Sequence, residues 1–331
     1  MEGKRGAMRK TRRDGLVRRL MGHLWTVGPS VYSTMTEEEC IDGEPWCVRV
    51  PNDRGEPILR SGRLEEVEGS RTLVVILHGM GGTVERGYCV LAARWAERMG
   101  MSHLRLALRG ADGVGMDLHH AGFVDDLGPI LSHFSRERYD TVALVGYSLG
   151  GHVALKAALE GVDDRLSAVC AICPPLDLAA AQEAIDGPGG WVYRRYLLRG
   201  LKCAYRAIAS GGQVPTPLKR IEVVNTLREW DSLTVVPRFG FRDVDDYYES
   251  QSVGPRLKDM EIPALVVASP GDPMVPAQSL RGPLAHASPS VVVRWVHDGG
   301  HVFFPPNTEL GLGTQTGVEA QIMEWVCDQQ R

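Results

Sequence analysis

The chain has 331 residues, of which 44% are hydrophobic and 24% charged, and a formal net charge of −4. This length and apolar content suffice for a large buried core, and the slight negative charge argues against nucleic acid as the main partner. Seven cysteines, an odd number without regular spacing, favour a reducing compartment. We therefore expect a cytoplasmic protein without a disulfide framework.

Residues 1–20 are strongly basic, and we expect them to form a flexible N-terminal tail. The residues that follow do not match a signal peptide, and no apolar run approaches the roughly 18 residues that span a bilayer. An apolar group lies beside the basic residues, so weak contact with a membrane surface stays open as an alternative. This group consists of Leu16, Val17, Leu20 and Met21.

Apolar runs typical of buried strands alternate along the chain with amphipathic helical patterns. The predicted strands are 73–77, 104–108, 142–145, 168–172, 264–268 and 291–296. This alternation predicts an α/β fold with a mostly parallel central sheet and helices on both faces. In such sheets, ligands bind at the carboxyl ends of the strands.

One connection, 174–262, is far longer than usual. It predicts a largely helical cap inserted between the sixth and seventh strands, which leaves 21–173 and 263–331 as the core. Its aromatic side chains either dock the cap on the core or line an acyl pocket. They include Trp230, Phe239, Phe241, Tyr247 and Tyr248.

The sequence Gly146-Tyr147-Ser148-Leu149-Gly150 follows a predicted strand and precedes a predicted helix. This G-x-S-x-G pattern is typical of a nucleophile elbow, a sharp turn that exposes a serine hydroxyl. Glycine is required at both ends because side chains there would collide with neighbouring backbone. Ser148 is the predicted nucleophile, and it needs a histidine base and an acid that orients that histidine.

The two partners follow in the order expected for this fold, serine, then acid, then histidine. Asp272 lies in a turn after the strand that ends at Ala268, and His301 follows two glycines after the last strand. Asp177 is an alternative acid, although its position also suits the N-cap of a helix. His297 falls within the last strand run and is interpreted as a structural histidine.

An oxyanion hole needs backbone N–H donors, and the loop from His78 to Gly82 has the required glycines. The predicted donors are the N–H groups of Met80 and Leu149. His78 is expected to brace this loop. Neither a cofactor nor a metal site is predicted, and Cys170 and Cys173, a lone C-x-x-C pair, are interpreted as buried thiols.

These residues resemble the YheT-like branch of the α/β hydrolases, a group of predicted serine esterases. The resemblance covers nearly the whole chain, from Gly22-His23-Leu24-Trp25-Thr26 to Gly299-Gly300-His301. It implies an α/β-hydrolase fold and the same triad, Ser148, Asp272 and His301. The chain departs from the family pattern at Trp25, Ala107-Leu108, His152 and Cys173.

The sequence thus predicts a serine hydrolase that cleaves carboxylic esters, with short- to medium-chain acyl or lipid-like substrates, through an acyl-enzyme on Ser148. The main alternative is an acyltransferase that passes the same acyl group to an alcohol. His120 and Asp125 spell H-x-x-x-x-D, a pattern found in some acyltransferases, but a helix-entry role for Asp125 and Asp126 is the simpler interpretation. A binding protein that retains the fold without turnover is the third alternative.

Overall fold

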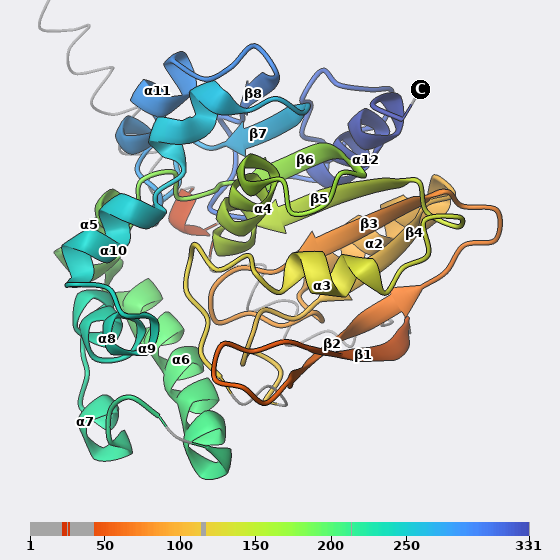
Figure 1. Cartoon of the computed structure of the whole chain (residues 1–331). Helices are drawn as coiled ribbons and strands as arrows, with labels where there is room; N and C mark the ends of the chain where they lie inside the picture. Colours follow the sequence, from red (N-terminus) through yellow and green to blue (C-terminus); the bar gives the residue numbers. More distant parts are fainter. Residues whose placement is uncertain (1–21, 25, 27–42, 114–116, 213, 331) are drawn as a thin grey trace, which may run out of the picture.

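The computed structural model describes residues 22–24, 26, 43–113, 117–212 and 214–330, and its centre is an eight-stranded sheet (Figure 1). The predicted N-terminal tail and the apolar group from Leu16 to Met21 lie outside the described residues. The strands are ordered β1-β2-β4-β3-β5-β6-β7-β8 across the sheet. Their bounds are β1 Glu44–Val50, β2 Ile58–Glu65, β3 Thr72–Leu77, β4 Ser102–Leu106, β5 Thr141–Tyr147, β6 Leu166–Ile172, β7 Ala264–Ala268 and β8 Val291–Trp295.

The six predicted strands are β3 to β8, and all of them pair in parallel. Their central members are continuous runs of valine, leucine, isoleucine and alanine because both faces of the sheet are covered. The antiparallel hairpin β1–β2 extends this sheet beside β4 and was absent from the sequence prediction. Polar and charged residues interrupt both strands of the hairpin, so it lacks the apolar runs that identify the other strands.

Helices cover both faces of the sheet, as predicted. Buried residues of α3 and α4 pack with one face of the sheet in a first apolar core. Those of α2 and α12 pack with the opposite face in a second core. The helices outside the long connection are α2 Gly87–Arg98, α3 Leu127–Ser132, α4 Leu149–Glu160, α11 Ala277–Ala285 and α12 Val318–Asp328.

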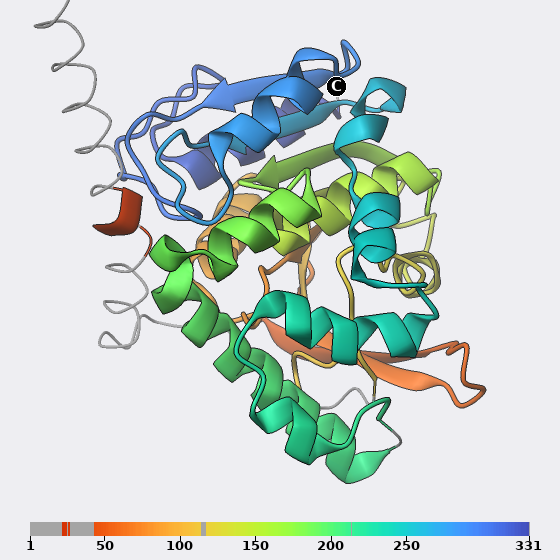
Figure 2. The same cartoon turned by 90° about the vertical axis from the view of Figure 1, so that its left-hand side faces the viewer.

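The long connection between β6 and β7 is helical, and in Figures 1 and 2 its green and cyan helices stand beside the sheet. A third apolar cluster is centred on these helices and includes Tyr205, Ile221 and Trp230. The helices of the long connection are α5 Leu178–Asp186, η1 Pro188–Gly190, α6 Trp191–Gly211, α7 Leu218–Glu222, α8 Leu227–Leu233, α9 Val235–Phe239, α10 Val244–Gln251 and η2 Gly254–Asp259.

One expectation about an individual residue was wrong, that for His297. His297 lies beyond the end of β8 and is exposed, because the strand stops at Trp295. Asp126 lies at the N-cap position of α3, which agrees with the expected helix-entry role, although its side chain makes no cap hydrogen bond there. Its carboxylate instead accepts hydrogen bonds from the buried guanidinium of Arg109.

Candidate active site

Ser148 lies in the sharp turn between β5 and α4, with a left-handed φ of 54°. The turn is close to neighbouring backbone on both sides. A Cβ atom built on Gly146 would lie 2.1 Å from the carbonyl oxygen of Gly150, and one built on Gly150 would lie 2.3 Å from that of Leu77. Glycine at these positions therefore permits the strained turn that exposes the hydroxyl.

The structure brings the three predicted side chains together in a hydrogen-bonded line. His301 Nε2 lies 2.6 Å from Ser148 Oγ, and His301 Nδ1 lies 2.6 Å from Asp272 Oδ2. The other carboxylate oxygen, Oδ1, accepts the N–H groups of Met274 and Val275 at 2.8 and 3.0 Å. This arrangement fixes the carboxylate and leaves Nε2 to accept the serine proton.

Thr26 belongs to a segment distant in sequence that lies against the loop of His301. Its Oγ1 accepts the N–H of His301 at 2.9 Å and donates to the carbonyl of Gly22 at 2.7 Å. A Cβ atom on Gly300 would lie 2.4 Å from the same oxygen, which leaves glycine as the residue that fits there. The reasoning from catalytic motifs missed Thr26, whose only signal was the family resemblance around Gly22-His23-Leu24-Trp25-Thr26.

The glycine-rich loop after β3 adjoins the turn that holds Ser148. A Cβ atom on Gly79 would lie 3.2 Å from Ser148 Cβ. His78 Nε2 accepts the N–H of Leu108 at 3.1 Å, so its Nδ1 carries the proton and donates to the Gly79 carbonyl at 2.8 Å. Burial lowers the pKa of His78 to about 4, which makes it the neutral brace that the sequence suggested.

Met80 and Leu149 both line the cavity that contains Ser148 and His301. Within the described residues, the structure records no acceptor for the backbone N–H of either one. Free N–H groups beside a serine hydroxyl are what a developing oxyanion requires.

Cys173 is a further group at this site, and the sequence interpretation treated it only as a buried thiol. Its sulfur, the Asp272 carboxylate and the His301 ring lie within 4.8 Å of one another, a set that could hold a metal ion. The imidazole and carboxylate are already hydrogen-bonded to each other, and burial with the neighbouring carboxylate raises the pKa of the thiol. A protonated thiol is a poor metal ligand. The geometry therefore fits a thiol that donates to Asp272.

The alternative residues lie elsewhere. Asp177 caps α5 by accepting the N–H of Ala180 at 3.0 Å, and no bond to a histidine is recorded for it in the described chain. His120 is buried against Phe239, whereas Asp125 is exposed, and no contact links the H-x-x-x-x-D pair. His152 is held between the carbonyl oxygens of Pro175 and Gln251, at 2.7 and 2.9 Å.

A cavity of about 470 Å³ opens beside Ser148. Of the five aromatic residues singled out in the long connection, Tyr247 and Tyr248 line it, together with Tyr193 and Tyr196. Trp230 packs on Tyr205, and Phe239 and Phe241 pack on His120. Apolar walls are formed by Leu178, Ala181, Ile185, Val192, Leu197, Leu227, Val275 and Val302.

The sequence model described as "Alpha/beta hydrolase family" matches residues 74–309, the span from β3 to the loop beyond His301. The chain belongs to this family. It is 30% identical over 260 residues to "Putative esterase YheT" of Escherichia coli, covering 76% of each chain. It is also 25% identical to "Phospholipase ABHD3" of Bos taurus, covering 71% of this chain but only 59% of that protein.

A monoacylglycerol lipase from Mus musculus is 22% identical over 81% of this chain and 68% of its own length. Among solved structures, Est1E from Butyrivibrio proteoclasticus has a TM-score of 0.54 with 17% identity, covering 86% of this chain and 98% of that one. The esterase Pf2001 from Pyrococcus furiosus has a TM-score of 0.52 with 16% identity, covering 78% and 85%. These structures establish the fold, and the sequence relatives support hydrolase activity.

No helix in the described part of the chain is both long and apolar enough to cross a membrane.

Proposed function

We propose that this protein is a serine hydrolase that cleaves carboxylic esters through an acyl-enzyme on Ser148. The observation that carries the proposal is the continuous line from Ser148 Oγ through His301 to Asp272, with 2.6 Å at each step. The names of its relatives, an esterase, a phospholipase and a monoacylglycerol lipase, support the same reaction class.

In this mechanism Ser148 Oγ attacks the ester carbonyl while His301 Nε2 takes its proton. The N–H groups of Met80 and Leu149 stabilise the negative oxygen of the tetrahedral intermediate. His301 then gives the proton to the departing alcohol, which leaves the acyl group on Ser148. Water, deprotonated by the same imidazole, releases the acid and restores the serine. Asp272 holds the ring in the required tautomer throughout.

The cavity beside Ser148 favours substrates with an apolar chain. Its walls are largely aliphatic and aromatic side chains, many of them from the segment 174–262, which acts as a cap in this proposal. A volume of about 470 Å³ suits a small or medium-sized ester better than a bulky polymer. Short- to medium-chain or lipid-like esters are the proposed substrate class.

Replacement of the nucleophile tests the reaction directly. We expect Ser148→Ala to lose kcat by roughly 10⁶-fold on p-nitrophenyl esters of graded chain length, as in other enzymes with this triad. A fluorophosphonate probe should label the wild type and leave Ser148→Ala unlabelled. Equal labelling of both proteins, or of neither, would refute the proposal.

The same assay separates hydrolysis from acyl transfer, since both pass through the acyl-enzyme. In the presence of an added alcohol, the ratio of free acid to new ester reports which acceptor resolves it. We expect free acid to dominate. A new ester as the main product at low alcohol concentration would assign the protein as an acyltransferase.

A further inference from the structure

Asp231, on α8, is a carboxyl group on the wall of the cavity beside Ser148. Its side chain retains partial exposure, which the cavity surface accounts for. The Tyr248 hydroxyl donates to its Oδ2 at 2.7 Å. Leu178, Ile185 and Leu227 line the same cavity, so an ionisable group sits in largely apolar surroundings.

No cation in the part of the chain that the structure describes is paired with the Asp231 carboxyl. Within the described residues, the Tyr248 hydroxyl is its only recorded hydrogen-bond partner, and no ion pair to it is recorded. Burial, opposed by the Tyr248 hydrogen bond and aided by the nearby Asp186 carboxylate, raises the pKa of Asp231 to about 7. Asp186 is itself bound to the N–H groups of Leu227 and Arg228. Asp231 Oδ1 therefore faces a lipophilic cavity without a recorded partner in the described part of the chain.

An acceptor in apolar surroundings is costly to leave unpaired, and a ligand that supplies a donor removes that cost. A hydroxyl group suits both forms of Asp231, because it can donate to Oδ1 of the ionised carboxylate and accept from the Oδ1–H group of the protonated carboxyl. An ammonium group would be favoured only in the ionised form. A plain alkyl chain in the same place would displace water from the carboxyl and would not replace its hydrogen bond.

We propose that Asp231 is a specificity residue that recognises a hydroxyl group on the substrate, so that the preferred substrates are esters with a hydroxylated aliphatic chain. This inference rests on the proposed function of Ser148, whose cavity it shares. It narrows the substrate class from lipid-like esters in general to those that carry a hydrogen-bond donor within reach of α8.

The test compares p-nitrophenyl esters of straight-chain acids of equal length that end in a methyl, a hydroxyl or a methoxy group, over short to medium chains. The methoxy ester has the size and oxygen of the hydroxyl ester but cannot donate. At a pH above the pKa of about 7, where Asp231 is ionised and can only accept, we expect the wild type to prefer the hydroxyl ester over the methoxy ester in kcat/KM by about tenfold at the best chain length.

Asp231→Leu should abolish this preference and raise kcat/KM for the methyl ester. Asp231→Asn, which keeps an acceptor oxygen, should retain part of the preference. The matched control is Asp245→Asn, an exposed carboxylate on α10 whose ion pair with Arg228 lies outside the cavity lining, and it should behave as wild type. If Asp231→Leu does not fold, Asp231→Ala provides the same comparison.

Fluorophosphonate labelling at the wild-type rate shows that each variant retains an intact nucleophile. The inference would be overturned if labelled, active wild type had the same kcat/KM for the hydroxyl and methoxy esters and Asp231→Leu gave the same ratio. The proposed function would then still stand. Absence of labelling and turnover in the wild type would instead overturn the proposed function.

Discussion

The orientation of His301 depends on a residue far away in sequence. Thr26 is buried, and its hydroxyl oxygen is the recorded acceptor for the backbone N–H of His301. The side chain of His301 is meanwhile held at both ring nitrogens by Ser148 and Asp272. Thr26 therefore fixes the backbone from which the imidazole projects, and in the proposed reaction it is a positioning residue.

Thr26→Val keeps the shape of the side chain but leaves the His301 N–H without an acceptor in a buried position. We expect kcat/KM on p-nitrophenyl esters to fall by about tenfold, mostly through kcat, because an orphaned buried donor costs about 1–3 kcal/mol. Thr26→Ser keeps the hydroxyl and should stay within about twofold of wild type. Equal rates for the valine and serine variants would show that this hydrogen bond does not position the histidine.

Side chains that belong to a sequence motif could be placed together from the sequence, whereas side chains brought to the site by packing could not. Ser148, Asp272 and His301 each follow a strand in a fixed order, so their meeting point follows from the fold. Cys173 and Asp231 carry no such motif. The first contacts Asp272 because β6 and β7 are neighbours, and the second reaches the cavity only through the packing of α8 on α10.

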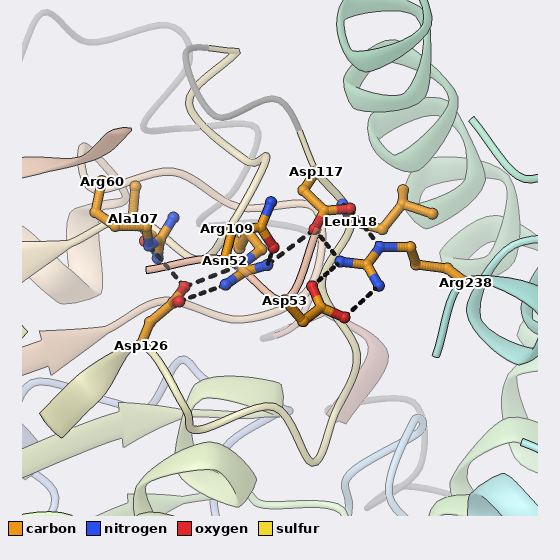
Figure 3. A network of polar contacts seen from close by, with 9 residues as sticks. All are labelled: Asn52, Asp53, Arg60, Ala107, Arg109, Asp117, Leu118, Asp126 and Arg238. Atoms are coloured by element: carbon orange, nitrogen blue, oxygen red, sulfur yellow. Dashed lines mark hydrogen bonds and ion pairs between the residues drawn. The ribbon is translucent and has the colours of Figure 1, made fainter. Parts of the chain in front are cut away.

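At the scale of secondary structure, a chain of buried ion pairs connects the long helical connection to the sheet (Figure 3). Arg238, on α9, binds Asp117 and Asp53. Asp117 also accepts a hydrogen bond from Arg109 at 2.9 Å, and Arg109 forms a second ion pair with Asp126. The network thereby joins α9 to the β1–β2 turn and to the loop between β4 and α3.

Arg238→Met tests whether this network holds α9 in place. Its loss leaves Asp117, whose side chain is only 4% exposed, with one guanidinium in place of two. We expect the free energy of unfolding to fall by about 3 kcal/mol, the usual cost of breaking a buried pair. Urea denaturation measures this change, and faster amide exchange confined to α9 would locate it.

Asp53→Asn is the matched variant at the other end of the same guanidinium. The Asp53 side chain is 66% exposed, so solvent screens its pair with Arg238 and the expected loss is below about 1 kcal/mol. Similar losses from Arg238→Met and Asp53→Asn would contradict the assignment of the stabilisation to the buried side of the network.

Most of the strands that the sequence predicted are buried along nearly their whole length, which favours a continuous apolar run. The central strands are apolar throughout because helices cover them on both sides. The β1–β2 hairpin is not identified by such a pattern, since its strands are interrupted by charged residues, among them Arg49, Arg60 and Arg63. Arg60 is buried all the same, because it forms an ion pair with Asp126 and donates a hydrogen bond to the Ala107 carbonyl, and no local pattern in the sequence predicts those partners.

For the whole molecule, the buried histidines make stability depend on pH. Burial lowers the pKa of His78, His103 and His152 to about 4 and that of His120 to about 3. These rings stay neutral in the native state, whereas in the unfolded chain they take up protons below their ordinary pKa of about 6.5. Their contribution to stability is complete above pH 6.5 and decreases as the pH falls towards about 4.

Two carboxyl groups act in the opposite direction. Burial raises the pKa of Asp231 and Glu319 to about 7, so both are protonated in the native state below that pH and ionised in the unfolded chain down to about 4. They favour the native state as the pH falls. Because the buried histidines outnumber them, unfolding takes up protons overall, and we expect the free energy of unfolding to decrease between pH 6.5 and pH 4.

His103 offers the sharpest test of this balance. It is fully buried on β4, and neither ring nitrogen has a hydrogen-bond partner among the described residues. His103→Leu therefore removes a titrating group without breaking a recorded bond, and it should reduce the pH slope by up to about 1.4 kcal/mol per pH unit. Urea denaturation across this pH range measures the slope, with His133→Leu at an exposed position as the control. Parallel pH curves for the two variants would show that the ring of His103 does not contribute to the acid sensitivity, since its loss would then change stability by the same amount at every pH.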